Sequence, residues 1–489
     1  MSLPRSLAVS ALTVLSGLAL SVPAVSQMAL PSNVQPTCTV PSSTFATWFQ
    51  TGTPSSGGVV NGADSVNFPT NNTVCDFYTW GAQMFLWLTS PTPSGGLVLD
   101  SQTIFNVLPA NAASARFLQP NTGSTPYFAL RAEKFDEIGE LGQAGSNGVL
   151  LSQQGSLVYY GVHVNQIYAF FLTGQKNGQI QATVFPRNSQ DLSQVIKYAS
   201  NMFPGVPVLD PQTLVMEFKS SWVDASTVPD KSKFVTMEAV VPKFSHDSST
   251  TWSQAGTETL ELALVGLHIV GTVQNHPEFV WITYEHIMNA PDEVYYYQNS
   301  SDQTASQPYD ASGTFLFQES GAAASPANTE CMKVSGTQIV AITNSSTGKP
   351  ACAGGIVASN TVRTYPWGSA ANNQSTAVVS NNTLLLSINH SVRGQLVGSD
   401  VRGNYVQTGG IWTSAPSATA DAPIPDTNAF SAGDLRGSLQ AFNATMETYV
   451  QGTSCFNCHK QKANAPDSFQ AFELSHIYSQ IVPLPTGGR

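Results

Sequence analysis

The pentapeptide Cys455-Phe456-Asn457-Cys458-His459 near the C-terminus carries the most specific chemistry in this sequence. Two cysteines three positions apart, followed at once by a histidine, are typical of covalent haem attachment, in which the thiols form thioethers and the histidine binds iron. The spacing suits this chemistry because residues i and i+3 lie on one side of a helical turn. A zinc site would need a second ligand pair, and a thioredoxin-like site would lie early in a βαβ unit. The motif therefore predicts one covalent haem c, held by Cys455, Cys458 and His459.

The iron would need a ligand on its other side, and His476 is the first candidate. Phe469, Phe472 and His476 recur at positions i, i+3 and i+7, so they would share one apolar stripe of a helix spanning residues 467–481. Such a stripe is suited to pack on a porphyrin. We expect His476 to be the distal ligand.

Three other side chains compete with His476 for that position. Met446 precedes the motif by nine residues and would lie on a helix spanning residues 431–448. His268 and His286 come from a β-rich region, and an open or water-filled site is a further alternative. For Met446 and His476, ordinary helix packing is the competing interpretation.

His268 belongs to the densest polar group outside the motif. Residues 258–273 and 278–286 have the composition of two strands, and a turn at residues 274–277 would place His268 opposite Thr283, on the face that carries Trp281 and Glu285. A histidine beside a glutamate and a tryptophan could bind iron, relay a proton or line an electron path. A hydrogen bond between His and Glu on a polar sheet face is the other interpretation.

The N-terminus and the remaining cysteines both indicate export. Residues 1–26 combine Arg5, an apolar run over residues 7–20 and the small-residue signal Ala24-Val25-Ser26, so we expect a Sec signal peptide with cleavage near Ser26 and Gln27. No later segment offers about 18 uninterrupted apolar residues, and we expect no membrane span. The predicted location is periplasmic or secreted.

Four cysteines remain beyond the motif, and an even number in an oxidising compartment suggests disulfides. They allow three connectivities. We favour Cys38 with Cys75 and Cys331 with Cys352, because each pair closes a modest loop bordered by Pro, Gly and Ser. A catalytic dithiol is the functional alternative.

Composition limits the partners. The 489 residues are 42% hydrophobic but only 10% charged, with a formal net charge of −11. An acidic chain argues against nucleic acid as a partner and favours a basic redox protein.

The local patterns predict an α+β protein. A buried amphipathic helix is expected over residues 75–88 and another helix over residues 191–202. Strand-like runs lie at residues 155–160, 179–184, 213–223, 233–241, 258–273, 278–286, 337–342 and 383–388. We expect a β-rich body, either an antiparallel sheet or a sandwich, with a small helical segment for haem attachment at the C-terminus.

The same patterns suggest a domain organisation. Residues 27–205 form an N-terminal mixed α/β region and residues 206–413 a β-rich domain. The stretch 414–426 (SAPSATADAPIPD) has the composition of a linker, and residues 427–489 form the haem segment. About 60 residues can hardly bury both faces of a haem, so we expect the cofactor to lie against the preceding domains.

Several segments together resemble a known family. They are Val215-Met216-Glu217-Phe218-Lys219-Ser220-Ser221-Trp222, Gly266-Leu267-His268-Ile269-Val270-Gly271, His276-Pro277-Glu278, Trp281, Tyr284-Glu285-His286, Met446-Glu447-Thr448 and the C-x-x-C-H motif. Over about residues 75–482 they are similar to large exported bacterial proteins called cytochrome c family proteins. The resemblance implies a single covalent haem and a β-rich body, but no assigned reaction. No Met-bearing loop follows the haem motif, so this chain departs from small class I cytochromes.

Two classes of function follow. The first is electron transfer through a six-coordinate haem to a partner protein. The second is a haem-dependent oxidoreductase with a substrate site in the β-rich domain, and a redox or gas sensor is a third alternative. The sequence shows no G-x-G-x-x-G in a βαβ setting and no H-E-x-x-H.

Overall fold

The computed structural model describes most of the chain from residue 26 onward. The described residues are 26–68, 73–109, 115–121, 125–126, 128–129, 148–310, 313–322, 327–413, 435–440, 443–459, 471–475 and 477–486. The predicted signal peptide up to residue 25, the predicted linker 414–426 and His476 lie outside them.

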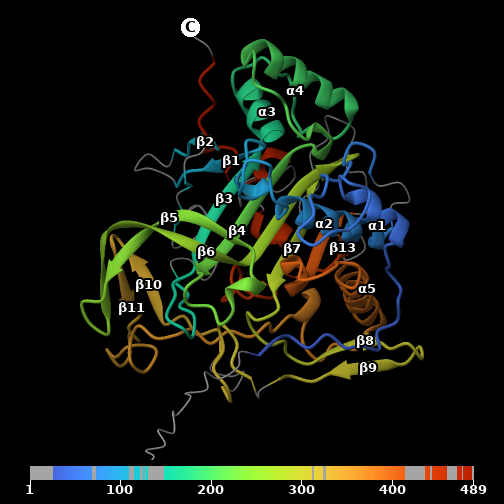
Figure 1. Cartoon of the computed structure of the whole chain (residues 1–489). Helices are drawn as coiled ribbons and strands as arrows, with labels where there is room; N and C mark the ends of the chain where they lie inside the picture. The colour runs from blue at the N-terminus through green and yellow to red at the C-terminus, as the bar shows by residue number, and fades with distance from the viewer. Residues whose placement is uncertain are drawn as a thin grey trace, which may run out of the picture.

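The fold is α+β and is built on a large antiparallel sheet (Figure 1). Within the described residues this sheet has 11 strands, with β13-β12-β7-β6-β4-β3-β1-β2 as its main order, and β8 and β9 form a separate pair. The strands are β1 (Ile104–Val107), β2 (Leu118–Pro120), β3 (Tyr159–Asn165), β4 (Met216–Asp224), β5 (Thr236–Ser245), β6 (Thr251–Val273), β7 (His276–His286), β8 (Tyr295–Gln298), β9 (Thr304–Gln307), β10 (Met332–Ser335), β11 (Gln338–Ala341), β12 (Tyr405–Thr413) and β13 (Leu435–Gly437). The prediction of a β-rich antiparallel body is confirmed.

The helices gather at two places around the sheet. They are α1 (Ser42–Trp48), α2 (Val74–Leu88), α3 (Gln166–Lys176), α4 (Ser189–Met202), α5 (Thr376–Arg393) and α6 (Cys455–His459). Short 3-10 turns lie at Val98–Asp100, Pro211–Thr213, Lys231–Lys233, Pro366–Gly368, Val401–Asn404 and Ala471–Leu474. In Figure 1, α3 and α4 lie together at one end of the sheet, and α1, α2 and α5 lie along one side.

The long hairpin of β6 and β7 has the predicted register. Val273 pairs with His276 and His268 pairs with Thr283. The hairpin turns at Asn275, whose φ of 64° lies in the left-handed region that Asn tolerates in tight turns. Because side chains alternate along a strand, Trp281, Thr283 and Glu285 share one face of β7 with His268 beside them on β6, as expected.

The opposite face of β7 packs against α2. The rings of Phe85 and Tyr284 stack with centroids 4.1 Å apart. A Cβ on Gly81 would lie 2.8 Å from Cγ2 of Ile282, so glycine is what lets α2 approach this strand. A capping box between Thr73 and Asp76 begins the helix, which confirms the helix predicted from residue 75 to residue 88.

Several local predictions are wrong. Residues 376–393 form α5, although the run 383–388 was expected to be a strand, and residues 179–184 contain no strand. In the described parts of the two predicted C-terminal helices, residues 435–437 are strand β13, residues 444–450 are turns and bends, and residues 471–474 are a 3-10 turn. The helical segment expected for haem attachment is therefore reduced to α6 and this 3-10 turn within the described residues.

Both predicted disulfides are present. Cys38 pairs with Cys75 at a Cα–Cα distance of 5.4 Å, and Cys331 pairs with Cys352 at 5.3 Å. The first bridge ties the chain just before α1 to the start of α2. No helix among the described residues is long and apolar enough to cross a membrane.

The boundary at residue 206, between the predicted N-terminal region and the predicted β-rich domain, stays a prediction. Strands from both sides of it join the one sheet, because β3 pairs with β4 along six residue pairs. The hydrogen-bonded layer is thus continuous where the sequence suggested a division.

A buried ionic cluster closes one end of β7. Nη1 of Arg363 lies 3.0 Å from Oε2 of Glu285, and its Nε lies 2.5 Å from Oδ1 of Asp292. Its Nη2 donates to the carbonyl of Ala290. Arg363 is 1% exposed, so water does not solvate its charge. The opposite charges and hydrogen bonds within the cluster take the place of water.

We expect Arg363→Met to destabilise the protein by about 3–5 kcal/mol, because it leaves two buried carboxylates without their cation. The free energy of unfolding in urea measures this. Lys231→Ala is the matched control, since it removes an exposed ion pair with Glu261 and should leave the unfolding midpoint unchanged. Equal midpoints for wild type and Arg363→Met would show that the cluster contributes nothing.

Candidate functional site

The motif Cys455–His459 forms the single helical turn α6. This conformation brings positions 455 and 458 to one side of the turn, as thioether attachment to one porphyrin requires. Cys455 is partly buried and packs against the smaller of two apolar clusters, which also contains Phe456 and Trp281. The motif therefore lies against the sheet.

His459 is held by its Nδ1 atom. This nitrogen lies 2.9 Å from the carbonyl oxygen of Leu474. A carbonyl can only accept, so Nδ1 carries the hydrogen and the lone pair of the neutral imidazole is on Nε2. Histidines that bind metals commonly donate their other ring N–H to a backbone carbonyl in this way, which orients the ring.

The imidazole of His459 also packs on Trp281 of β7. The two ring centroids are 4.1 Å apart, and the indole is 6.1 Å from the ring of Phe456. These contacts fasten the motif to strand β7. The expected position of a haem against the preceding domains stays a prediction.

An aromatic wall extends from Trp281 toward α3. We use this name for the side chains Phe171, Phe185, Phe279, Trp281, Phe456, Phe472 and Tyr478, each of which contacts another member. Phe472 and Tyr478 stack with centroids 4.6 Å apart, and Phe185 lies 4.7 Å from Phe279. Segments distant in sequence therefore build one apolar surface beside His459, of the kind that lowers the local dielectric around a cofactor.

A buried polar chain lies next to the wall. The hydroxyl of Ser475 donates to Oε2 of Glu217 at 2.5 Å, and the hydroxyl of Tyr168 lies 2.7 Å from that of Ser475. Burial raises the pKa of Glu217 to about 7, while the Ser475 hydrogen bond, Lys219 and Arg116 act in the opposite direction. No sequence pattern marks Glu217 as a site residue, because its partner Ser475 lies 258 residues away.

Residues 443–447 are fastened to the same sheet face by a second set of hydrogen bonds. Asn443 Nδ2 donates to Thr283, the Ala444 N–H donates to Glu285 and the hydroxyls of Thr445 and Ser221 lie 2.8 Å apart. The segment before the motif is thereby anchored along β4, β6 and β7.

His268 completes this anchor. Its Nε2 donates to Oε1 of Glu447 over 2.6 Å. The predicted face is correct, but the partner is Glu447 rather than Glu285, which binds Arg363 instead. The pair is partly exposed, with side-chain accessibilities of 18% and 11%.

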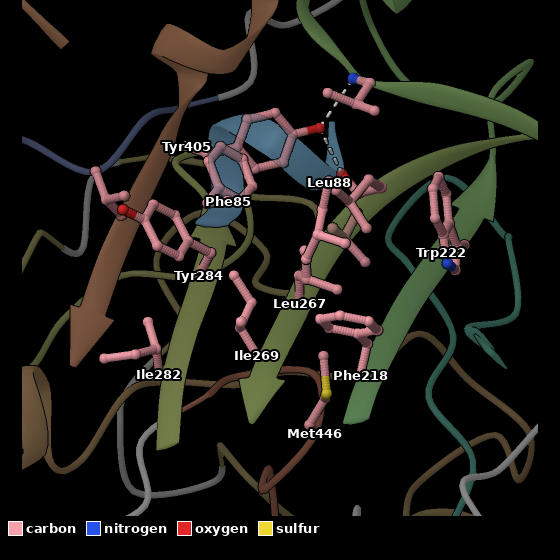
Figure 2. Packing of buried hydrophobic residues seen from close by; sticks show 14 of the residues in the cluster. Phe85, Leu88, Phe218, Trp222, Leu267, Ile269, Ile282, Tyr284, Tyr405 and Met446 are labelled. Atoms are coloured by element: carbon pink, nitrogen blue, oxygen red, sulfur yellow. Dashed lines mark hydrogen bonds between the residues drawn. The ribbon is translucent and has the colours of Figure 1, made fainter. Parts of the chain in front are cut away.

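The side chain of Met446 packs in the larger of the two apolar clusters. It is fully buried, in the cluster that contains Phe218 and Ile269 (Figure 2). A Cβ on Gly266 would lie 3.2 Å from its Cε atom, so the missing side chain at Gly266 makes room for the thioether. As an iron ligand, Met446 would have to leave this packing.

His286 lies on the other face of β7, away from His459. Its Nδ1 accepts from the N–H of Met288 and its Nε2 donates to the carbonyl of Lys233. The ring stacks on Phe234, and burial lowers the pKa of His286 to about 3. Both nitrogens are thus occupied in the fold, which argues against the ligand role considered for His286.

Comparison of the chain with family models, curated proteins and solved structures gave no match. The described residues also contain no group of three or more His, Cys, Asp or Glu side chains that could hold a metal ion. A haem iron takes protein ligands only at its two axial positions, so a haem site does not require a group of three such side chains. What bears on a haem site is the geometry at His459.

The pKa of Glu217 gives the first prediction for this region. Its raised pKa means that the folded protein retains a proton that the unfolded chain loses, so stability is highest below the unfolded pKa and falls as the pH rises to about 7. Glu217→Gln should remove this dependence, which amounts to roughly 2 kcal/mol in all. Urea unfolding at several pH values between 4.5 and 8 measures it.

Glu238→Gln is the control, because Glu238 is an exposed carboxylate on β5. It should leave the pH dependence of stability as in the wild type. A Glu217→Gln variant with the wild-type dependence would show that Glu217 titrates as it does in the unfolded chain.

Proposed function

We propose that this protein is an exported monohaem c-type cytochrome that transfers electrons through a haem bound at Cys455, Cys458 and His459. The observation that carries the proposal is the hydrogen bond from Nδ1 of His459 to the carbonyl of Leu474. It selects the imidazole tautomer that offers Nε2 to iron, and it occurs at the histidine that the motif designates.

The surrounding residues fit such a cofactor. Cys455 and Cys458 come from one helical turn, and the aromatic wall beside His459 would cover apolar porphyrin edges. The haem, when bound, supplies a one-electron couple. The chain's own residues orient the ligand through Leu474 and Trp281 and exclude water through the wall, which sets the dielectric on which a reduction potential depends.

For the distal ligand we propose His476. Ser475, its neighbour in sequence, is buried and hydrogen-bonded to Glu217 on the sheet face that carries Trp281. The chain next to residue 476 is therefore held close to the motif, and its 3-10 turn supplies the acceptor for His459. His268 is the alternative, and it would have to exchange its bond to Glu447 for iron.

We further propose that the protein works in the periplasm or outside the cell with a basic redox partner. The two disulfides are typical of oxidising compartments, and the net charge of −11 favours a cationic partner. The predicted signal peptide and the resemblance to exported cytochrome c family proteins support the same location.

A second function has one observation in its favour. His268 and Glu447 form a partly exposed acid–base pair on the sheet face that holds the motif. Such a pair could move protons in a haem-dependent oxidoreductase or gas sensor. In that case the iron would keep one coordination position accessible to small ligands.

Spectroscopy of the purified protein tests the proposal. In a host that attaches haem c, we expect a covalent haem by mass spectrometry, and its loss in the Cys455→Ser/Cys458→Ser double variant. We expect a low-spin ferric spectrum that is inert to cyanide, and a ferrous form inert to carbon monoxide. A high-spin haem that binds either ligand would favour the oxidoreductase or sensor, and wild-type protein without covalent haem would refute all three.

Replacing His476 by Ala tests the distal ligand. We expect the low-spin spectrum to become high-spin and cyanide to bind, because the sixth position loses its nitrogen ligand. His390→Ala is the matched control, since His390 on α5 binds the carbonyl of Pro31. An unchanged low-spin spectrum in His476→Ala would exclude this ligand and direct the search to His268.

A further inference from the structure

The indole N–H of Trp281 is a buried donor without an acceptor among the described residues. Trp281 is 6% exposed and lies directly against the ring of His459. A buried N–H that makes no hydrogen bond destabilises the folded state, because it has lost its hydrogen bonds to water without replacement. This position therefore calls for an acceptor that the described protein groups do not supply.

Two hydroxyl groups near this wall do have partners. The hydroxyl of Tyr168 bonds with that of Ser475, and the hydroxyl of Tyr478 donates to Gln175 at 2.8 Å. The residues paired with Trp281 across the sheet are Val270 and Ile411, and both are apolar. The N–H of Trp281 is one of several buried donors without a partner among the described residues, and it lies in apolar surroundings against the ring of the proposed iron ligand.

We infer that the indole N–H of Trp281 donates a hydrogen bond to a propionate carboxylate of the haem, an inference that rests on the proposed function. The two propionates are the anionic groups of an otherwise apolar macrocycle. Indole is a donor and cannot accept, which matches a carboxylate. Hydrogen bonds to charged acceptors are about twice as strong as neutral ones, so this contact both satisfies Trp281 and stabilises the ionised propionate.

The inference makes Trp281 a cofactor-binding residue with two roles. Its ring supports the imidazole of His459, and its N–H would hold one propionate carboxylate of the haem. Because the hydrogen bond favours the ionised propionate, it lowers the pKa of that group. The reduction potential therefore varies with pH in a way that depends on the indole N–H.

The test is Trp281→Phe, which keeps an aromatic ring and removes the donor. The reduction potential is measured as a function of pH on the holoprotein. We expect the protonation constant of the redox-linked carboxylate to rise by about tenfold, because its ionised form loses a charge-assisted hydrogen bond. Trp222→Phe is the matched control, since it removes another buried indole N–H without an acceptor, on β4 in the other apolar cluster, and should reproduce the wild-type curve.

The outcomes separate the two proposals. Haem attached to Trp281→Phe with the wild-type pH dependence overturns the inference and leaves the proposed function intact, whereas wild-type protein without haem overturns both. If Trp281→Phe does not fold, the wild type still decides. One of its eight indole ¹H–¹⁵N resonances should shift with the pKa seen in the potential, and the absence of any such shift would overturn the inference.

Discussion

The arrangement of the molecule depends on the hydrogen bonds and the ion pair that the carboxylate of Glu285 makes. This carboxylate is fully buried on β7 and receives donors from Asn289, four residues along the chain, and from two distant segments: the side chain of Arg363 and the backbone N–H of Ala444. A buried carboxylate is tolerated only when its oxygens are satisfied, so these donors must converge on it. The last of these donors places the C-terminal segment on the sheet.

From that anchor, residues 443–447 follow the face of β4, β6 and β7 through side chains with few apolar atoms. Thr445 meets Ser221 and Glu447 meets His268, while Met446 between them enters the apolar cluster. This alternation of polar bonds and one buried side chain determines where α6 begins. The C-x-x-C-H motif therefore follows a segment whose hydrogen bonds to the sheet are made eight or more residues earlier.

The sheet contributes different surfaces to the two ends of this segment. Around Glu285 and His268 it offers acceptors and donors, whereas around Trp281 it offers aromatic rings that continue through Phe279 to Phe185. His459 thus lies beside aromatic rings, and the polar contacts of residues 443–447 lie farther along the same sheet face. The properties of the iron would be set by strands far from the motif in sequence, as the small size of the C-terminal segment suggested.

What the sequence could predict was local or strongly patterned. The β6–β7 register followed from the alternation of side chains around an Asn turn, and α2 followed from its apolar periodicity. Helix α5 was missed because it is rich in Asn, Ser and Thr. Its buried Asn389 is satisfied by the carbonyls of Leu385 and Gln407, and the second of these contacts exists only in the folded protein.

The same limit applied to the site. The motif identified His459, but the partner of its Nδ1 is a backbone carbonyl, which has no signature in sequence. Likewise the partner of His268 lies 179 residues away, so the nearby Glu285 was the natural but mistaken choice. Which residues form long-range pairs of this kind depends on the fold, because the order of the strands decides which distant segments lie side by side.

The contacts of the histidines limit which of them could be the distal ligand of the proposed haem. Of the eight in the chain, His163 uses both ring nitrogens with Asn106 and Ser220, and His286 is occupied on the opposite sheet face. His276 bonds with Glu278, His390 with the carbonyl of Pro31, and His246 stacks on Trp252 at the far end of β6. None of these five contacts the aromatic wall within the described residues. If the proposed haem has a second histidine ligand, the remaining candidates are His268, which would exchange its carboxylate partner, and His476, whose neighbour Ser475 is held on the sheet beside the motif. The support for His476 is the hydrogen bond of its neighbour Ser475 to Glu217, on the sheet face that also carries Trp281.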